Sequence, residues 1–265
     1  NTGISLIDDT TLRIQAGTVW DDVVAFAVEH GLGGIEALSG IPGSAGATPV
    51  QNVGAYGAEI ADVLTRVRLH NRETGVDEWA PASSLDLAYR YSNLKFTSRA
   101  VVLEIELQLE KTDESIPLRH LGGARVPLAQ ARESVLETRR AKGMVLDASD
   151  HDTWSAGSFF TNPVVPSALA DEIAAHVGED AMPRFAAGDG KEKLSAAWLI
   201  ERAGCHRGFP GDDAPARLST KHTLALTNRG NASAADIVDL ARRVQAQVRD
   251  AFGVELHPEP VWVGL

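Results

Sequence analysis

The sequence predicts an α+β protein, and three observations support that class. Segments with apolar residues at helical spacing are mixed with β-branched, strand-like segments, but not in the regular alternation of a doubly wound parallel sheet. A length of 265 residues with a hydrophobic content of 44% suffices for one large or two ordinary domains. A loop-rich stretch at 147–166 then marks a boundary between two domains.

Two helices are predicted from apolar spacing combined with end signals. The first begins at Trp20, with Thr18 as its expected N-cap. The second lies near the C-terminus, where Ser233 and Asp236 form a capping pair and Gly253 ends the helix. Weaker patterns predict helices at 127–141, 167–177 and 194–204, and strands at 11–17, 63–70, 100–109 and 222–228.

Composition and charge exclude several classes of protein. The 25 basic and 36 acidic side chains give a net charge of −11 without basic blocks, which argues against general nucleic-acid binding. The single cysteine, Cys205, rules out a disulfide framework, and we expect it to be buried and inert. The eight histidines show no metal-ligand spacing, so we expect no metal site. There is neither an apolar run of about 18 residues nor a leader-type N-terminus, so we expect no membrane span and no secretion signal.

Residues 31–60 are rich in glycine and other small residues. This stretch contains neither the G-x-G-x-x-G fingerprint of dinucleotide-binding proteins nor the Gly-Lys-Ser/Thr of a P-loop. Within it, Ile-Pro-Gly-Ser-Ala-Gly at 41–46 could turn backbone N–H groups and the Ser44 hydroxyl toward an anion. A tight turn between packed elements is the more common origin of such a composition. Both interpretations remain open on the residues alone.

Three further segments carry candidate chemical groups. Arg90 stands between Tyr89 and Tyr91, and aromatic neighbours would restrict its guanidinium before it pairs with a carboxylate. Ser158 follows a small-residue turn that is not a G-x-S-x-G elbow, so it could donate a proton in a dry site but does not indicate a hydrolase. Glu259 lies between two prolines that stiffen its backbone. The respective alternatives are a surface loop, a strand end and a solvated tail.

Taken together and in chain order, seven segments resemble the UDP-N-acetylenolpyruvoylglucosamine reductases, the MurB family, and within it the type I branch. They are 41–46, 51–57, 89–92, 157–163, 193–200, 231–236 and 258–259. Each segment is weak alone, but seven in the same order are specific. The resemblance implies a two-lobed FAD-binding domain of the vanillyl-alcohol-oxidase (PCMH-like) type at 1–152, with its N-terminal lobe missing. It further implies a smaller α+β substrate-binding domain at 153–257 and a segment, 258–265, that returns to the active site.

The resemblance also implies an activity, that of a UDP-N-acetylmuramate dehydrogenase. In this flavoenzyme family NADPH reduces a bound FAD, which passes a hydride to the enolpyruvyl ether of UDP-N-acetylglucosamine for peptidoglycan synthesis and cell-wall biogenesis. The implied protein is a cytoplasmic monomer that acts on a small molecule, without nucleic-acid or membrane partners. Its catalytic residues would be Arg90, which stabilises charge on the substrate carboxylate, Ser158, which protonates C2, and Glu259, which donates a hydrogen bond.

The ligand-binding residues implied by the resemblance fall into two groups. Substrate binding is expected at Tyr89, Asn162 and Lys193, and cofactor binding at Pro42, Gly43, Ser44, Gly46, Asn52, Gly54, Ala55, Tyr56, Gly57 and Ile60. Two alternatives remain: another FAD-dependent oxidoreductase of the same flavin fold, acting on alcohols or sugars, and a non-catalytic UDP-sugar-binding fragment. The first would not need the Gly-Ser-Phe-Phe-Thr-Asn-Pro segment or the Pro-Glu tail, and both are present.

Overall fold

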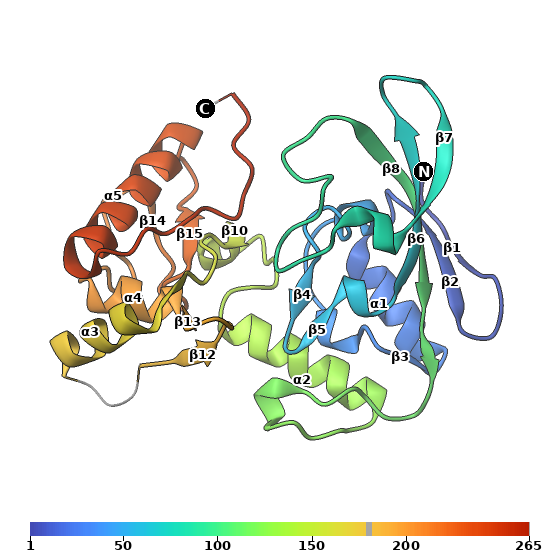
Figure 1. Ribbon diagram of the computed structural model, residues 1–265, viewed down its shortest axis with the longest axis horizontal. Coiled ribbons are helices and arrows are strands. Elements are labelled where there is room, and N and C mark those ends of the chain that lie inside the picture. The colour runs from blue at the N-terminus through green and yellow to red at the C-terminus, as the bar shows by residue number, and fades with distance from the viewer. Residues whose placement is uncertain (179–181, 265) are drawn as a thin grey trace. The chain divides into compact units, whose positions relative to one another are not determined.

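The computed structural model describes residues 1–178 and 182–264, and it divides the chain into two compact units, Asn1–Arg140 and Ala141–Leu265 (Figure 1). Each unit combines helices with antiparallel sheets around its own hydrophobic core, so the predicted α+β class is confirmed. The expected domain boundary at 152/153 falls inside the second unit. None of the helices in the two described ranges has both the length and the apolar character that crossing a membrane requires.

The first unit is built on a five-stranded antiparallel sheet of order β1-β2-β8-β6-β7 (Figure 1). In the three central strands Ile14, Ile105 and Val67 lie side by side in register and are fully buried. This inward face packs on the core, as expected for an antiparallel sheet with one solvated side. The strands are β1 (Ile4–Leu6), β2 (Thr11–Gln15), β6 (Leu64–Asn71), β7 (Asp77–Pro81) and β8 (Ala100–Gln108).

The helices of the first unit are α1 (Trp20–Glu29) and α2 (Leu128–Ala141). The predicted N-cap of α1 is wrong: Val19 holds that position, and the Thr18 hydroxyl instead accepts from the Gly3 N–H at 2.9 Å. Asp21 in the first turn of α1 pairs with Arg132 of α2, with 2.7 Å between carboxylate oxygen and guanidinium nitrogen. The predicted apolar stripe of α1 is confirmed, since it buries Trp20, Val23, Val24 and Ala27.

Short elements complete the first unit, and one short helix belongs to the second. Two small antiparallel pairs lie beside the main sheet, β3 (Leu32–Gly33) with β9 (Glu110–Lys111) and β4 (Gly54–Ala55) with β5 (Ala58–Glu59). The 3₁₀ helices are η1 (Glu36–Leu38), η2 (Ala45–Ala47), η3 (Ile60–Asp62), η4 (Ala82–Leu85), η5 (Arg119–Leu121) and, in the second unit, η6 (His151–Thr153). Several of these short elements carry candidate site residues.

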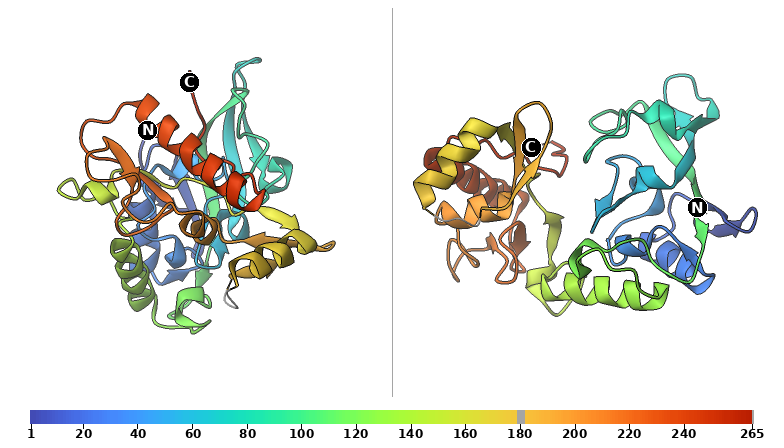
Figure 2. Two further views of the ribbon diagram at one scale, coloured as in Figure 1. Left: turned by 90° about the vertical axis from the view of Figure 1, so that its left-hand side faces the viewer. Right: turned by 60° about the horizontal axis from the view of Figure 1, so that its bottom comes forward.

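The second unit contains two antiparallel sheets, over residues 141–178 and 182–264, with strand orders β10-β15-β14 and β11-β13-β12. The long helix α5 packs against α4 and across β14 and β15 (Figure 2). The strands are β10 (Ser155–Ser158), β11 (Val164–Pro166), β12 (Arg184–Ala186), β13 (Lys191–Leu194), β14 (Ala216–Leu218) and β15 (Ala225–Asn228). The helices are α3 (Ser167–Val177), α4 (Ala196–Arg202) and α5 (Ala234–Phe252).

Local sequence signals account for the ends of α5. Ser233 and Asp236 form the predicted capping box, in which each side chain accepts from the other residue's backbone N–H. Gly253 ends the helix in the left-handed region at φ +66°, as predicted. Cys205 is fully buried as expected, and burial raises the pKa of its thiol to about 11.

Candidate active site

The Ile-Pro-Gly-Ser-Ala-Gly segment packs closely on Ala16, the residue that follows strand β2. A Cβ at Gly46 would lie 2.5 Å from the Cβ of Ala16, and the Gly46 N–H donates to the Ala16 carbonyl at 2.9 Å. Close packing therefore explains this glycine without a ligand. By contrast, Pro42 and Gly43 are exposed and Ser44 is half-buried, with nothing within 4 Å of a Cβ built at Gly43. The stretch 42–44 is thus the part that remains accessible to a ligand.

The Gly-Ala-Tyr-Gly segment forms the β4–β5 hairpin, whose two turn residues are Tyr56 at φ +52° and Gly57 at φ +106°. Positive φ at both positions is the geometry that favours a tight two-residue hairpin. The Tyr56 carbonyl accepts from the Arg119 N–H at 3.2 Å, and its ring meets that of His120 edge-on, with centroids 4.8 Å apart. Burial raises the pKa of the Tyr56 hydroxyl. The hairpin tip is therefore fixed to the η5 segment.

Asn52 links this hairpin to the loop that carries Arg90. It is almost completely buried, at φ +48°. One N–H of its side-chain amide donates to Glu59 Oε2 at 2.8 Å and the other to the Ala88 carbonyl at 3.0 Å. Its Oδ1 accepts from the Ala61 N–H at 3.0 Å. The adjoining Ile60 is fully buried in the core. The side chains of Asn52 and Ile60 thus stabilise the segment that contains the hairpin from within the protein.

Arg90 lies against the same hairpin. Its Nη2 donates to the Gly54 carbonyl at 2.5 Å, and its Nη1 lies 3.8 Å from Glu59 Oε1. The Lys95 ammonium donates to the Arg90 carbonyl at 3.1 Å and so holds a backbone with φ +55°. The guanidinium carbon is 5.0 Å from the centre of the Tyr89 ring, so the expected contact with this aromatic neighbour is present. A Cβ at Gly54 would lie 2.9 Å from Arg90 Nη1, which explains the need for glycine there.

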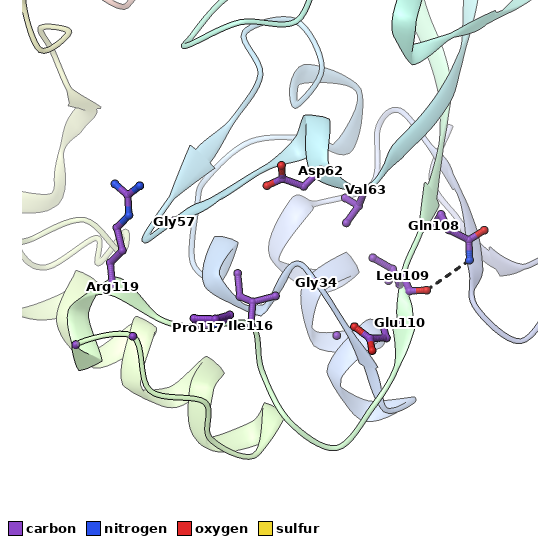
Figure 3. A pocket seen from close by; sticks show the side chains of 13 residues that line it. Gly34, Gly57, Asp62, Val63, Gln108, Leu109, Glu110, Ile116, Pro117 and Arg119 are labelled. Carbon is purple, nitrogen blue, oxygen red and sulfur yellow. Dashed lines mark hydrogen bonds between the residues drawn. The ribbon is translucent and has the colours of Figure 1, made fainter. Parts of the chain in front are cut away.

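A cavity of about 750 Å³ opens in the first unit (Figure 3). Figure 3 shows Gly57 and Arg119 on one side of it and Leu109 and Glu110 on the other. Of the predicted cofactor residues, Gly57 lines this cavity. Much of the wall is glycine backbone. The lining residues are Gly33, Gly34, Gly57, Asp62, Val63, Gln108, Leu109, Glu110, Ile116, Pro117, Arg119, Gly122 and Gly123.

The cavity wall depends on a glutamate that sequence reasoning missed. Glu36 is completely buried, and its carboxylate accepts from the backbone N–H groups of Gly34 at 2.7 Å and Ile116 at 2.6 Å. Both partners line the cavity, so this carboxylate joins two wall segments that are distant in sequence. Nothing in its local pattern singles it out, apart from a lone charge within a run of small residues.

In the second unit, backbone pairing brings the segment that contains Glu259 to the strand end that carries Ser158. Strand β10 ends at Ser158, and the next residues, Phe159 and Phe160, are buried in the second core. Phe160 forms an antiparallel bridge with Pro258, and the Glu259 N–H donates to the Phe159 carbonyl at 2.8 Å. Ser158 therefore lies at the end of a strand, and the two phenylalanines that follow it lie in the core, as one alternative predicted. The backbone of these phenylalanines also pairs with the C-terminal segment. Both Ser158 and Glu259 are half-buried.

The predicted substrate residues lie in both units. Tyr89 belongs to the first unit, as does Arg90, whereas Asn162 and Lys193 belong to the second with Ser158 and Glu259. Asn162 Oδ1 accepts from the Ala196 N–H at 3.0 Å, the first N–H of α4, whose N-cap is Ser195. Lys193 lies in β13, paired with Val164 of β11.

Sequence reasoning also missed a buried aspartate, Asp152, which lies just before β10. Its hydrogen-bond partners follow β14 and β15, the other two strands of the sheet that contains β10. Asp152 accepts from the Thr220 N–H at 3.0 Å, from the Thr220 hydroxyl and from Arg229 at 2.9 Å. Burial alone would raise the pKa of Asp152, but these donors hold it below its ordinary value. Nearby, burial together with the charges of Lys142 and Arg207 lowers the pKa of His222 to about 4. Across residues 1–178 and 182–264, no group of three or more His, Cys, Asp or Glu side chains is arranged to hold a metal ion.

Comparison with known proteins first defines a class of protein. A model described as "FAD binding domain" matches residues 1–76, and one described as "UDP-N-acetylenolpyruvoylglucosamine reductase, C-terminal domain" matches residues 148–263. The pair corresponds to a flavin-binding domain followed by a second, family-specific domain, as the motifs predicted.

The chain belongs to the UDP-N-acetylenolpyruvoylglucosamine reductase (MurB) family, which confirms the resemblance. It is 63% identical to "UDP-N-acetylenolpyruvoylglucosamine reductase 2" of Corynebacterium glutamicum, over 98% of this chain and 74% of that protein. Identity to the reductase of Corynebacterium diphtheriae is 60%, over 98% of this chain and 71% of that protein. The crystal structure of the Thermus caldophilus reductase aligns with a TM-score of 0.63 at 25% identity, covering 93% of this chain and 70% of that one.

Proposed function

We propose that this chain catalyses the NADPH-dependent, FAD-mediated reduction of UDP-N-acetylglucosamine enolpyruvate to UDP-N-acetylmuramate, a step of peptidoglycan precursor synthesis. Family membership supports the reaction. The observation that supports it is the backbone pairing of the C-terminal segment with residues 159–160, which brings the backbone of Glu259 to the strand end that carries the proposed proton donor Ser158. A cytoplasmic location, where NADPH and nucleotide sugars are available, and a monomeric state are part of this proposal.

The residues of the first unit fit a flavin nucleotide. The cavity volume of about 750 Å³ is in the range of cofactor pockets, and its glycine walls allow a flat ring to approach the backbone. Gly57 and the neighbouring hairpin backbone would line the ring, and the accessible turn at 42–44 would offer the N–H groups of Gly43 and Ser44 to the diphosphate. When bound, FAD supplies the two-electron chemistry that carries a hydride from NADPH to the substrate.

The chain's own residues would handle charge and protons. As C3 of the enolpyruvyl group accepts a hydride, an electron pair moves through C2 onto the substrate carboxylate. The Arg90 guanidinium would stabilise that developing charge, and Glu259, if protonated, would donate a hydrogen bond to the same group. The Ser158 hydroxyl would then transfer its proton to C2 and recover one from solvent. The balance is one hydride from NADPH and one proton from solvent for each product molecule.

The direct test mixes the FAD-loaded protein with NADPH, with and without UDP-N-acetylglucosamine enolpyruvate, and identifies the product by mass spectrometry. We expect NADPH oxidation that depends on the substrate and yields UDP-N-acetylmuramate. An oxidation rate unchanged by the substrate would refute the proposal.

Two controls address the alternative functions. Oxygen consumption with simple alcohols or sugars as the only substrates would indicate an oxidase of the same flavin fold. Calorimetric binding of the UDP-sugar without any turnover would indicate a non-catalytic binding module.

A further inference from the structure

We propose that Glu59 is the positioning residue for the Arg90 guanidinium, and that Asn52 fixes the orientation of Glu59. This inference rests on the proposed function, in which Arg90 acts on the substrate carboxylate. The observation behind it is a chain of contacts in which Asn52 donates to Glu59 at 2.8 Å and Glu59 lies 3.8 Å from Arg90.

The contacts on Arg90 fix the plane of its guanidinium. A guanidinium carries its five N–H donors in one rigid plane, so two contacts at different nitrogens determine its orientation. Here the Gly54 carbonyl contacts Nη2 at 2.5 Å and the Glu59 carboxylate lies near Nη1. The separation of 3.8 Å to Glu59 is a loose ion pair rather than a bidentate one. Glu59 therefore orients the cation through the charge of a loose ion pair.

Asn52 couples this carboxylate to the backbone that carries Arg90. One N–H of its amide holds Glu59 and the other holds the Ala88 carbonyl, two residues before Arg90. Arg90 itself has φ +55°, a conformation that persists only when surrounding contacts determine it. The same buried amide thus fixes the relative position of hairpin and loop. Orientation of this kind, set before the substrate arrives, lowers the barrier of the step that uses the charge.

The test separates the two half-reactions of the FAD-loaded protein by rapid mixing. In the proposed mechanism Arg90 acts in the reoxidation of the flavin by the enolpyruvyl substrate and has no role in flavin reduction by NADPH. Glu59→Ala is expected to slow substrate-dependent reoxidation by about 10- to 100-fold and to raise the KM of the substrate, while flavin reduction changes less than about two-fold. Glu59→Gln keeps an acceptor for Asn52 and removes the charge, so the reoxidation rate should fall less than in Glu59→Ala.

Matched variants keep the inference falsifiable. Asn52→Ala should also slow reoxidation, and Glu78→Gln, on the exposed strand β7, should behave as wild type. Reoxidation within two-fold of wild type in Glu59→Ala, or equal slowing of both half-reactions, would overturn the positioning role. Wild-type protein that shows no substrate-dependent reoxidation would instead overturn the proposed function, and this inference with it.

Discussion

Removing the Asp152 carboxylate is expected to destabilise the β10-β15-β14 sheet, whose strand β10 ends at Ser158. The Asp152 and Arg229 side chains are only 8% and 19% exposed, so their ion pair is largely desolvated. Loss of one member of a buried pair costs about 3–5 kcal/mol, because the other charge is left without compensation. Since Arg229 keeps some contact with water, we expect the lower end of that range, about 3 kcal/mol, for Asp152→Ala. Asp152→Asn retains an acceptor for the Thr220 N–H and should cost about 1–2 kcal/mol.

Native-state hydrogen exchange measured by mass spectrometry is the suitable assay, because a protein of two units need not unfold in a single transition. Peptides covering β14 and β15 report the opening free energy of the sheet that Asp152 supports. Asp250→Asn is the control. This exposed residue forms a loose ion pair with Arg249, with 3.8 Å between the charged atoms, so the opening free energy should change by less than about 0.5 kcal/mol. A change below about 1 kcal/mol for Asp152→Ala would refute the assigned role.

The pH dependence of this effect has a definite sign. The pKa of Asp152 is lower in the folded protein than its ordinary value of 3.8. Its stabilising contribution is therefore complete above the ordinary pKa and is lost as pH falls through the folded value. The difference between wild type and Asp152→Asn should persist from pH 7 to about pH 4 and shrink below it. An undiminished difference at pH 3, measured with longer exchange times, would contradict the ionised state assigned to Asp152.

Three further outcomes are expected. Ser158→Ala should slow substrate-dependent flavin reoxidation by about 10²- to 10⁴-fold without slowing flavin reduction by NADPH; unimpaired reoxidation would refute its role as an acid. Gly54→Ala would place a Cβ 2.9 Å from Arg90 Nη1 and from a facing backbone oxygen, and kcat/KM should fall about ten-fold or more. Gly3→Ala, whose nearest contact is 3.7 Å, is its control, and a wild-type kcat/KM for Gly54→Ala would contradict the packing argument. Native Cys205 should resist alkylation by iodoacetamide at pH 8 and react only in urea, because its pKa is about 11 and it is buried; rapid reaction of the native protein would contradict its burial.

The fold was predictable where local rules act alone. The capping box at Ser233 and the left-handed Gly253 each depend on residues within one turn, so α5 could be placed from the sequence. The same reasoning failed at Thr18, because its hydroxyl is taken by Gly3, a residue brought there by the pairing of β1 with β2. A capping rule that considers only the following turn cannot detect such competition.

The candidate site residues could be predicted mainly through the resemblance to the family. The contacts that position these residues could not be predicted from the sequence. The segments that carry Ser158 and Glu259 lie side by side because residues 159–161 pair with 257–259, a long-range match that no local periodicity indicates. Glu36 and Glu59 stand in small-residue segments without a recognisable spacing. The Glu36 carboxylate nevertheless accepts from the backbone N–H of Ile116, 80 residues away, and Glu59 accepts from the Asn52 amide. A buried acceptor such as Glu36 is found only once the fold shows which N–H groups lack another partner.

The residues of a family motif do not all contact the ligand. Their hydrogen bonds within the protein distinguish residues that hold the fold together from residues that are available to a ligand. Both N–H groups of the Asn52 amide and its oxygen are bonded inside the protein, Gly46 is required by its contact with Ala16, and Asn162 accepts from the first N–H of α4. Substituting these residues should reduce stability or misplace neighbours before it alters ligand contacts directly. Gly57 differs, since it lines the cavity. The fraction of a residue's polar groups already used within the fold is therefore a better guide to its role than its presence in the motif.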